Sequence, residues 1–171
     1  FVPNTRDEYL KHVQAIYNLK LHTDFPLVVH IETTNYCNQK CIMCCHPTMG
    51  RKPQHIDEEI AKKAIEECAL MKPWFIHFFF FGEPFINKAT LDYMKYAKSV
   101  GVKRVSITTN LTLPSKEDVE EMVDSGIDSI HVSFEGLDRH SYKRIRKTDH
   151  YEKVIENLEQ LLAYRKKQKT R

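Results

Sequence analysis

The stretch PLVVHIETTNYCNQKCIMCCHP, residues 26–47, contains two patterns in succession. Residues 26–34 are β-branched and largely apolar, which is typical of a parallel strand covered on both faces. The loop that follows holds four of the five cysteines of the chain, between residues 37 and 45. A disulfide framework connects distant segments, so cysteines crowded into one loop favour metal or cluster ligation in a reducing compartment.

Outside this stretch, short apolar segments alternate with longer amphipathic ones. Strict alternation of this kind predicts a parallel sheet with right-handed crossovers, and hence an α/β fold built from repeated βα units. Strands are predicted at 26–34, 74–81, 104–109 and 129–134, and helices at 5–20, 56–71, 88–100, 115–125, 137–146 and 151–167.

The apolar spacing of two helices predicts which side chains they bury. Ser115 and Asp118 also resemble a capping box at the start of the helix at 115–125, and Gly101 is expected to end the helix at 88–100. The predicted buried residues are Ile56, Ile60, Ala64 and Cys68 in one helix, and Val154, Ile155, Leu158, Leu161 and Leu162 in the other.

The composition is that of an ordinary globular protein. A length of 171 residues indicates one domain, or most of one, and the hydrophobic fraction of 42% suits a buried core. The net charge of +3 is too small to indicate a nucleic-acid partner. There is no apolar run long enough for a transmembrane helix and no visible signal peptide, so a cytoplasmic location is expected.

Chemically unusual residues follow each predicted strand. The cysteine loop follows the first, Gly82-Glu83-Pro84 the second, Thr109-Asn110 the third, and residues 133–136 the fourth. In parallel α/β sheets, ligands bind at the carboxyl ends of the strands. The sequence therefore predicts one ligand site at this edge of the sheet.

The spacing C-x3-C-x2-C of Cys37, Cys41 and Cys44 suits a 4Fe–4S cluster. Such clusters usually have four cysteine ligands, so three would leave one iron open to a small molecule. The alternative is a zinc ion held by the same cysteines and His46 in a closed tetrahedral site, in a non-catalytic structural or interaction module. Cys45 is interpreted as a bystander, Cys68 as a core residue, and His46 and His55 as loop residues without a role.

The segment CNQKCIMC, residues 37–44, resembles the signature loop of the radical S-adenosylmethionine (radical SAM) enzymes. The longer segment at 31–47 is similar to the branch with a C-terminal SPASM or twitch-type extension. The resemblance implies a partial TIM-like barrel of six βα units, of which four are predicted here. We therefore expect a helical lead-in at 1–25 and a radical SAM core at 26–171, truncated on its C-terminal side.

The same resemblance implies a 4Fe–4S cluster on the three cysteines and S-adenosylmethionine beside it. Gly82, Glu83 and Pro84 resemble the family's Gly-Gly-Glu-Pro motif, which receives the methionine amine, although Phe81 replaces the first glycine. Ser133 resembles the polar residue for the ribose and carboxylate, and Glu135 follows where an Asp is frequent.

The roles of three further residues can each be interpreted in two ways. Arg146 resembles an arginine that pairs with the methionine carboxylate, or it belongs to a solvated helix face. Asn110 reaches the cosubstrate or only caps its strand, and Leu111 replaces a family glycine beside it. Met43 lies beside the adenine, or fills apolar space, or does both.

The resemblance also implies an activity. A reductant of the flavodoxin or ferredoxin type supplies one electron, S-adenosylmethionine is cleaved reductively, and the 5′-deoxyadenosyl radical takes a hydrogen atom from a substrate. That substrate, a small molecule or a peptide, is not identified by the residues. No nucleic-acid or membrane partner is expected.

Overall fold

The computed structural model describes residues 7, 10, 11, 14, 15 and 25–168. Most of the helix predicted at 5–20 lies outside these residues. The strands are β1 (Val28–Ile31), β2 (Phe75–Phe78), β3 (Val105–Thr109) and β4 (Ser129–Val132), and the helices are α2 (Glu58–Met71), α3 (Thr90–Ser99), α4 (Lys116–Asp124), α5 (Arg139–Arg146) and α6 (Tyr151–Lys167).

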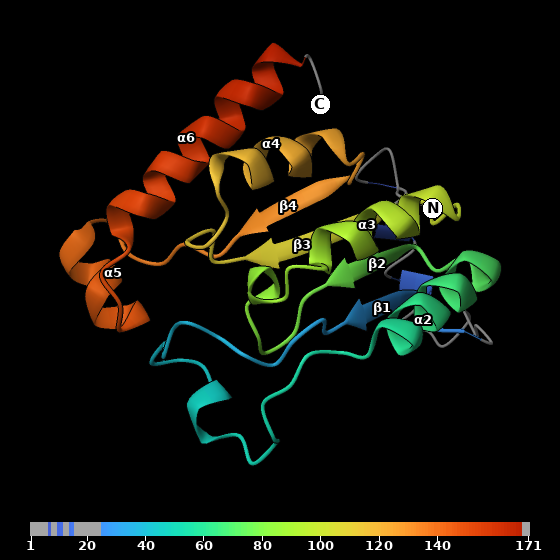
Figure 1. The fold of residues 1–171 in the computed structure, drawn as a ribbon, viewed down its shortest axis with the longest axis horizontal. Coiled ribbons are helices and arrows are strands. Elements are labelled where there is room, and N and C mark those ends of the chain that lie inside the picture. Colours follow the sequence, from blue (N-terminus) through green and yellow to red (C-terminus); the bar gives the residue numbers. More distant parts are fainter. Residues whose placement is uncertain (1–6, 8–9, 12–13, 16–24, 169–171) are drawn as a thin grey trace.

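The four strands form one parallel sheet in the order β1-β2-β3-β4 (Figure 1). Each neighbouring pair is connected by a helical crossover, as the alternating sequence predicted. The predicted α/β class and the parallel sheet of repeated βα units are therefore confirmed. Within the described ranges, no helix is both long and apolar enough to cross a membrane.

Three strands, β1, β2 and β4, end earlier than predicted, whereas β3 ends at Thr109 as predicted. Pairing between β1 and β2 ends at Ile31 and Phe78, and the residues beyond them turn into loops. Thr34 leaves the sheet to form an isolated antiparallel bridge with His55. The apolar run at 79–81 that extended the strand prediction is part of the site described below.

The core lies between the sheet and its helices. In β2 the buried Ile76 and Phe78 alternate with less buried residues, whereas β3, with Val105 and Ile107, is buried at nearly every position. They pack against buried residues of α2, α3 and α4, namely Ala61, Ile65, Cys68, Leu91, Met94, Ala97, Val119 and Met122. Cys68 is thus a core residue, as predicted.

The predicted apolar faces of two helices were partly wrong. Ile60 is 61% exposed, because α2 begins at Glu58 and its inward positions are Ala61, Ile65 and Cys68. In α6, Leu162 is 52% exposed, whereas the polar Asn157 is fully buried. A strict four-residue spacing drifts around a helix of 3.6 residues per turn, which moved the predicted stripe off the core.

A row of histidines crosses the sheet on the side away from α2, α3 and α4. His30 and His77 are register partners, with ring centroids 5.3 Å apart, and the rings of His77 and His131 are 5.5 Å apart. Nε2 of His77 lies 2.8 Å from the hydroxyl of Thr108 on β3. Burial, with smaller contributions from the neighbouring His30 and His131, lowers the pKa of His77 from 6.5 to about 4.

We expect this histidine to make folding stability depend on pH. Between pH 6.5 and pH 4 the unfolded chain binds a proton at His77 that the folded chain does not, so stability falls as the pH falls through this window. The variant His77→Gln should show a shallower loss of thermal unfolding midpoint from pH 7 to pH 4.5, measured on the full-length protein by circular dichroism. The exposed His140→Gln is the control, and an equal slope in all three proteins would contradict the assignment.

Candidate functional site

The cysteine loop between β1 and α2 is fixed at several points. The side chain of Asn35 donates to the carbonyl of Lys52 at 3.0 Å and accepts from the backbone N–H of Gln54 at 2.6 Å. Nε2 of His46 lies 2.8 Å from the carbonyl oxygen of Asn35, and Nδ1 of His55 lies 3.0 Å from the hydroxyl of Thr34. Both histidines lie in the loop, as predicted, and each contributes a hydrogen bond that stabilises it.

The loop also contacts α5, far along the chain. The backbone N–H of Ile42 donates to the carbonyl of Ile145 at 2.9 Å, and the buried side chain of Gln39 donates to the hydroxyl of Tyr142 at 3.1 Å. In Figure 1 the loop passes below α5 at one end of the sheet. Residues separated by about a hundred positions therefore form one wall.

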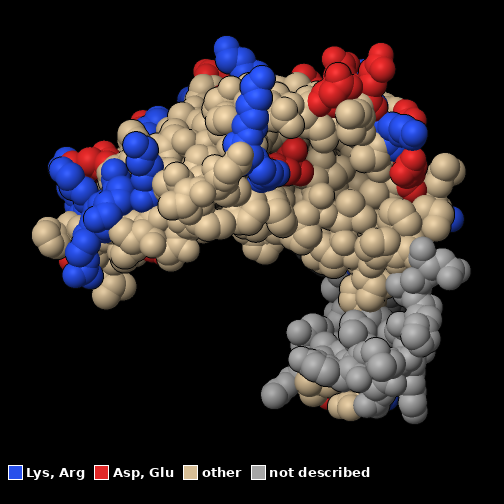
Figure 2. All heavy atoms as spheres, turned by 90° about the horizontal axis from the view of Figure 1, so that it is seen from below, with Lys and Arg blue, Asp and Glu red and all other residues tan. Residues whose placement is uncertain are grey.

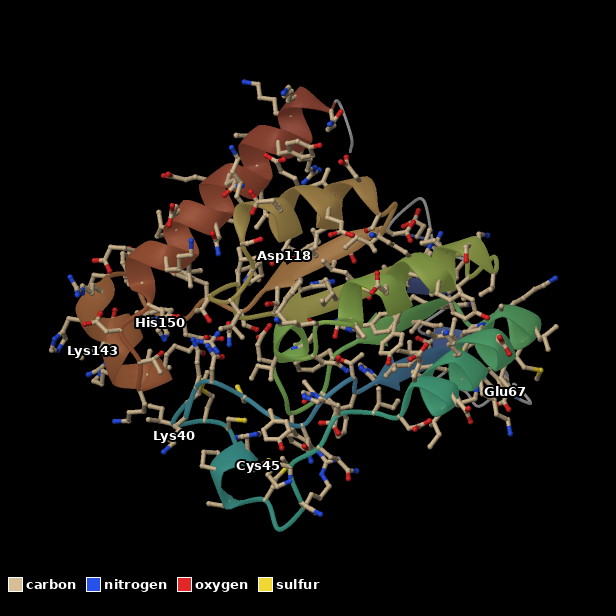
Figure 3. The ribbon with its side chains drawn as sticks, viewed as in Figure 1. Lys40, Cys45, Glu67, Asp118, Lys143 and His150 are labelled. Carbon is tan, nitrogen blue, oxygen red and sulfur yellow. The ribbon has the colours of Figure 1, made fainter. Side chains whose placement is uncertain are left out.

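One pocket at the carboxyl ends of the strands collects most of the predicted site residues. Pro84 does not line it but is buried and begins a 3-10 turn, Pro84–Ile86. Cys45 is exposed outside it (Figure 3). The predicted residues that do line it are Cys37, Cys41, Met43, Cys44, Gly82, Glu83, Asn110, Ser133 and Arg146, together with Gln39, Glu135, Thr109 and residues 79–81.

The three predicted cluster ligands are free thiols in this pocket. Cys41 is buried and Cys37 and Cys44 are half-buried. Burial raises the pKa of Cys37 to about 11, while the backbone N–H of Gln39 opposes this rise. Bound iron would reverse this preference for the protonated thiol, because a metal stabilises the thiolate.

A 4Fe–4S cluster and a single zinc ion make different demands on these side chains. In the described part of the chain, no three Cys, His, Asp or Glu side chains are grouped as ligands of one metal ion. A cubane contacts each cysteine through a different iron, so its ligands lie farther apart than those of a zinc ion. His46, the fourth ligand of the zinc alternative, is instead hydrogen-bonded to Asn35.

Glu83 connects the ends of β2 and β3. Its carboxylate is buried and accepts from the hydroxyl of Thr109 at 2.6 Å and from the backbone N–H of Asn110 at 2.7 Å. Burial raises the pKa of Glu83 to about 7, against the lowering effect of these donors and of Arg146. A cationic group entering the pocket would favour the ionised carboxylate.

Gly82 lies against the backbone of the cysteine loop. A Cβ at this position would lie 2.0 Å from the carbonyl oxygen of Thr34 and 2.9 Å from that of Tyr36. The next residue, Glu83, donates its backbone N–H to the carbonyl of Tyr36 at 2.8 Å. Only glycine allows this close approach of the two loops.

Phe81, which replaces the first glycine of the family motif, has a negative φ and so needs no glycine there. Its backbone N–H donates to Oε1 of Glu32 at 3.0 Å. Arg51 pairs with the same carboxylate through both terminal nitrogens and lies 5.5 Å from the centroid of the Phe81 ring. The replacement is thus accommodated by a local cluster of three side chains.

Leu111 adopts the conformation expected of the glycine that it replaces. Its φ is +57°, in the left-handed region where glycine is favoured, and its side chain is fully buried. Nδ2 of Asn157 in α6 donates to its carbonyl at 2.9 Å. Packing and this hydrogen bond hold a backbone turn that the sequence alone disfavours.

Asn110 joins the strand end to the cysteine loop. Its Nδ2 donates to the side-chain oxygen Oδ1 of Asn38 at 2.8 Å, and its own Oδ1 accepts from the backbone N–H and the hydroxyl of Thr112. Both ends of the amide are therefore engaged. Its contribution within the described chain is to brace the pocket wall.

Arg146 is the one strongly buried cation of the pocket wall, at 6% exposure, although Arg144 on the same helix is exposed. Nη1 donates to Oε1 of Gln39 at 3.3 Å and to Sγ of Cys41 at 3.4 Å. Nη2 forms an ion pair with Glu135, whereas Nε is buried without a hydrogen-bond partner. The reading of a solvated helix face was wrong, and the Nε–H donor is left for an anionic group.

Gln39 was missed by sequence reasoning. No role was predicted for it, yet it is 2% exposed and contacts both Tyr142 and Arg146. A polar side chain within a ligand motif can point inward to order the ligands. No periodicity signals this, because the loop is irregular.

Comparison with known proteins gives one family. The model of the Radical SAM superfamily matches residues 31–170. GTP 3',8-cyclase of Chlorobaculum tepidum is 31% identical over 136 residues, covering 79% of this chain and 41% of that protein. PqqA peptide cyclase of Bradyrhizobium diazoefficiens is 29% identical over 114 residues, covering 66% and 30%. The chain thus spans about two fifths or less of these relatives.

Solved structures share the fold. Streptococcus suis SuiB bound to S-adenosylmethionine superposes with a TM-score of 0.72 at 18% identity, covering 96% of this chain and 39% of that chain. For anSMEcpe with bound AdoMet and a Cp18Cys peptide, the TM-score is 0.66 at 19% identity, with 82% and 41% covered. These similarities support the partial-barrel architecture.

Proposed function

This chain belongs to the radical SAM superfamily, and from that membership we propose that it forms the catalytic core of an enzyme that binds a 4Fe–4S cluster and cleaves S-adenosylmethionine reductively. The observation that carries the proposal is the composition of one pocket. Three thiols, a buried carboxylate and a buried guanidinium face the same space at the carboxyl ends of the strands. A structural metal is normally enclosed by four ligands, so three thiols beside polar groups suit a reactive site.

Cys37, Cys41 and Cys44 would hold the cluster. The donor Nη1 of Arg146, 3.4 Å from Sγ of Cys41, would offset the negative charge of that thiolate. Met43, between the second and third cysteines, also lines the pocket and offers an apolar surface for the adenine. Cys45 would remain unligated, because it is exposed outside the pocket.

The ammonium and carboxylate groups of S-adenosylmethionine would each face a group of opposite charge in the pocket. Glu83 would accept from its ammonium group, and Gly82 and Pro84 would fix the backbone that presents this carboxylate. The unsatisfied Nε of Arg146 would donate to its carboxylate, and the guanidinium would add a favourable charge interaction. Ser133 lines the same pocket and would donate to the ribose or the carboxylate, while Asn110 braces the wall.

When bound and reduced by one electron from a flavodoxin- or ferredoxin-type donor, the cluster would supply the electron that splits S-adenosylmethionine into methionine and a 5′-deoxyadenosyl radical, which takes a hydrogen atom from the substrate. The residues of this chain orient the cosubstrate and exclude water. The names of its relatives include a nucleotide and a peptide as substrates, so family membership alone leaves the substrate class open. We place the core at 26–171, after a lead-in at 1–25.

The test is product formation. Full-length protein, reconstituted with iron and sulfide and reduced anaerobically with dithionite, is expected to release 5′-deoxyadenosine, detected by mass spectrometry. The variant with Cys37, Cys41 and Cys44 all changed to Ala is the control and should release none. Product in equal amount from that control would refute the mechanism, and none from the reconstituted enzyme with candidate substrates present would refute the activity.

A second measurement isolates the role of Glu83. Glu83→Gln should retain the cluster but weaken S-adenosylmethionine binding by ~1.5–3 kcal/mol, as for a lost hydrogen bond to a charged group. Equilibrium dialysis gives the affinity, and the iron content confirms that the cluster is present. Ser133→Ala should act in the same direction, more weakly.

A matched variant distinguishes direct binding of S-adenosylmethionine by Glu83 from an indirect effect on the loop that carries Glu83. Thr109→Val removes the hydroxyl that donates to Glu83 but leaves the carboxylate in place. If it weakened binding as much as Glu83→Gln, the effect would belong to the loop between β2 and β3, and the direct contact of Glu83 with the cosubstrate would be rejected.

A further inference from the structure

Three exposed cations surround the point where the cysteine loop meets α5. Lys40, Arg144 and Lys147 are all exposed, and in the described part of the chain none of them forms an ion pair. By contrast, Arg139 and Lys143 on the same helix are neutralised by Asp149. We call Lys40, Arg144, Lys147 and the 61%-exposed Ile42 the α5 patch.

The α5 patch lies directly outside the pocket wall. The hydrogen bond from the backbone N–H of Ile42 to the carbonyl of Ile145, at 2.9 Å, places the loop beside Arg144 and Lys147. On the inner side of this wall, Arg146 donates to Sγ of Cys41. In Figure 3, Lys40 and Lys143 are labelled at the same end of the molecule, and Figure 2 shows Lys and Arg side chains gathered at this end.

Resting on the proposed function, we propose that the α5 patch is the docking surface for an acidic one-electron carrier protein. Cations without partners attract an acidic surface and speed its encounter. The apolar side chain of Ile42 supplies a desolvated contact at the centre of a charged rim. The carrier is oxidised by one electron and the cluster is reduced by one, with no atom transferred, so the carrier must dock where the cluster loop reaches the surface.

The position of the patch favours a carrier over nucleic acid. Nucleic-acid sites need basic groups spread along a path, whereas the three cations of the α5 patch lie on one short helix end and one loop. The net charge of the whole chain is only +3. A compact basic surface over the cysteine loop suits a small acidic protein.

The test uses the full-length, cluster-loaded protein and a flavodoxin in its hydroquinone form. Charge reversal of Lys40, Arg144 and Lys147 to Glu should slow cluster reduction by the flavodoxin at least about tenfold at low salt, followed by stopped-flow absorbance. The difference should shrink as salt is added. Reduction by dithionite should be unchanged, since a small reductant needs no docking surface.

Matched controls exclude effects of net charge and of loop damage. Reversal of the exposed Lys63, Lys166 and Lys167 to Glu changes the net charge equally at remote sites. The double variant Arg144→Glu/Lys147→Glu leaves the cysteine loop intact and should show most of the loss. The proposal would be overturned if the patch and control variants were reduced by the flavodoxin at equal rates and with equal salt dependence. It would also be overturned if the patch variants lost oligonucleotide binding without any change in flavodoxin reduction.

This experiment is independent of the reaction itself. The affinity for the flavodoxin is also measured at low salt by interferometry, and the patch variants should bind more weakly than the control. Patch-dependent binding and reduction without 5′-deoxyadenosine formation would retain the docking surface and reject the proposed function. Product formation with dithionite, together with equal rates of flavodoxin reduction in the patch and control variants, would retain the proposed function and reject the docking surface.

Discussion

Changing Cys37, Cys41 and Cys44 together to alanine is expected to lower the iron content of the reconstituted full-length protein by about four atoms per chain and to abolish 5′-deoxyadenosine formation. All three thiols line one pocket, and each would bind a different iron. Alanine offers no ligand, and no fourth thiol of the described chain lines the pocket. Iron and sulfide assays, with the absorbance of the cluster, measure the loss.

Cys45→Ala is the matched control, because it removes a thiol from the adjacent position of the same loop. Cys45 is exposed outside the pocket, so its loss should leave iron content and product unchanged. Cys68→Ala, in the core, should retain the iron but lower stability slightly. Loss of the cluster in Cys45→Ala alone would show that the ligand assignment is wrong.

Gly82→Ala is expected to have the second largest effect. The added Cβ would lie 2.0 Å from the carbonyl oxygen and 2.7 Å from the carbonyl carbon of Thr34, so the backbone of one loop must move. Overpacking of this kind lowers the free energy of unfolding by about 1–3 kcal/mol. S-adenosylmethionine binding should fall below detection, because Glu83, the next residue, moves with the loop.

Gly50→Ala provides the comparison within the same protein. Gly50 has no atom within 4 Å of an added Cβ and no positive φ, so its stability should change by less than about 0.5 kcal/mol. Urea unfolding and equilibrium dialysis measure the two variants side by side. Gly82→Ala with unchanged stability and affinity would mean that the contact with Thr34 does not constrain the site.

The fold and the position of the site were predictable from the sequence because they depend on regular patterns. Alternating strands and helices specify a parallel sheet, and the polar residues after each strand then meet at one edge. The capping box of Ser115 and Asp118, confirmed at the start of α4, follows from local spacing alone. The end of α3 just before Gly101, whose φ is +92°, follows in the same way.

Other features depend on contacts between distant segments, which no local pattern contains. Arg146 is buried only because the cysteine loop, through Gln39 and Cys41, packs against α5. The left-handed turn at Leu111 depends on burial and on Asn157, since its side chain disfavours that conformation. The second strand was predicted too long because the aromatic run at 79–81 has strand propensity but lines the pocket instead.

The hydrogen bonds of Asn157 set a lower limit on the length of any shortened form of this domain. Its amide holds the carbonyls of both Leu111 and Pro114, at 2.9 and 3.1 Å, and so fixes the loop that leaves β3. Deleting α6 would remove both hydrogen bonds, and the loop that begins at Asn110 would lose this support. Minimal versions made for crystallisation or spectroscopy should therefore extend at least to Leu161, the last buried residue of α6.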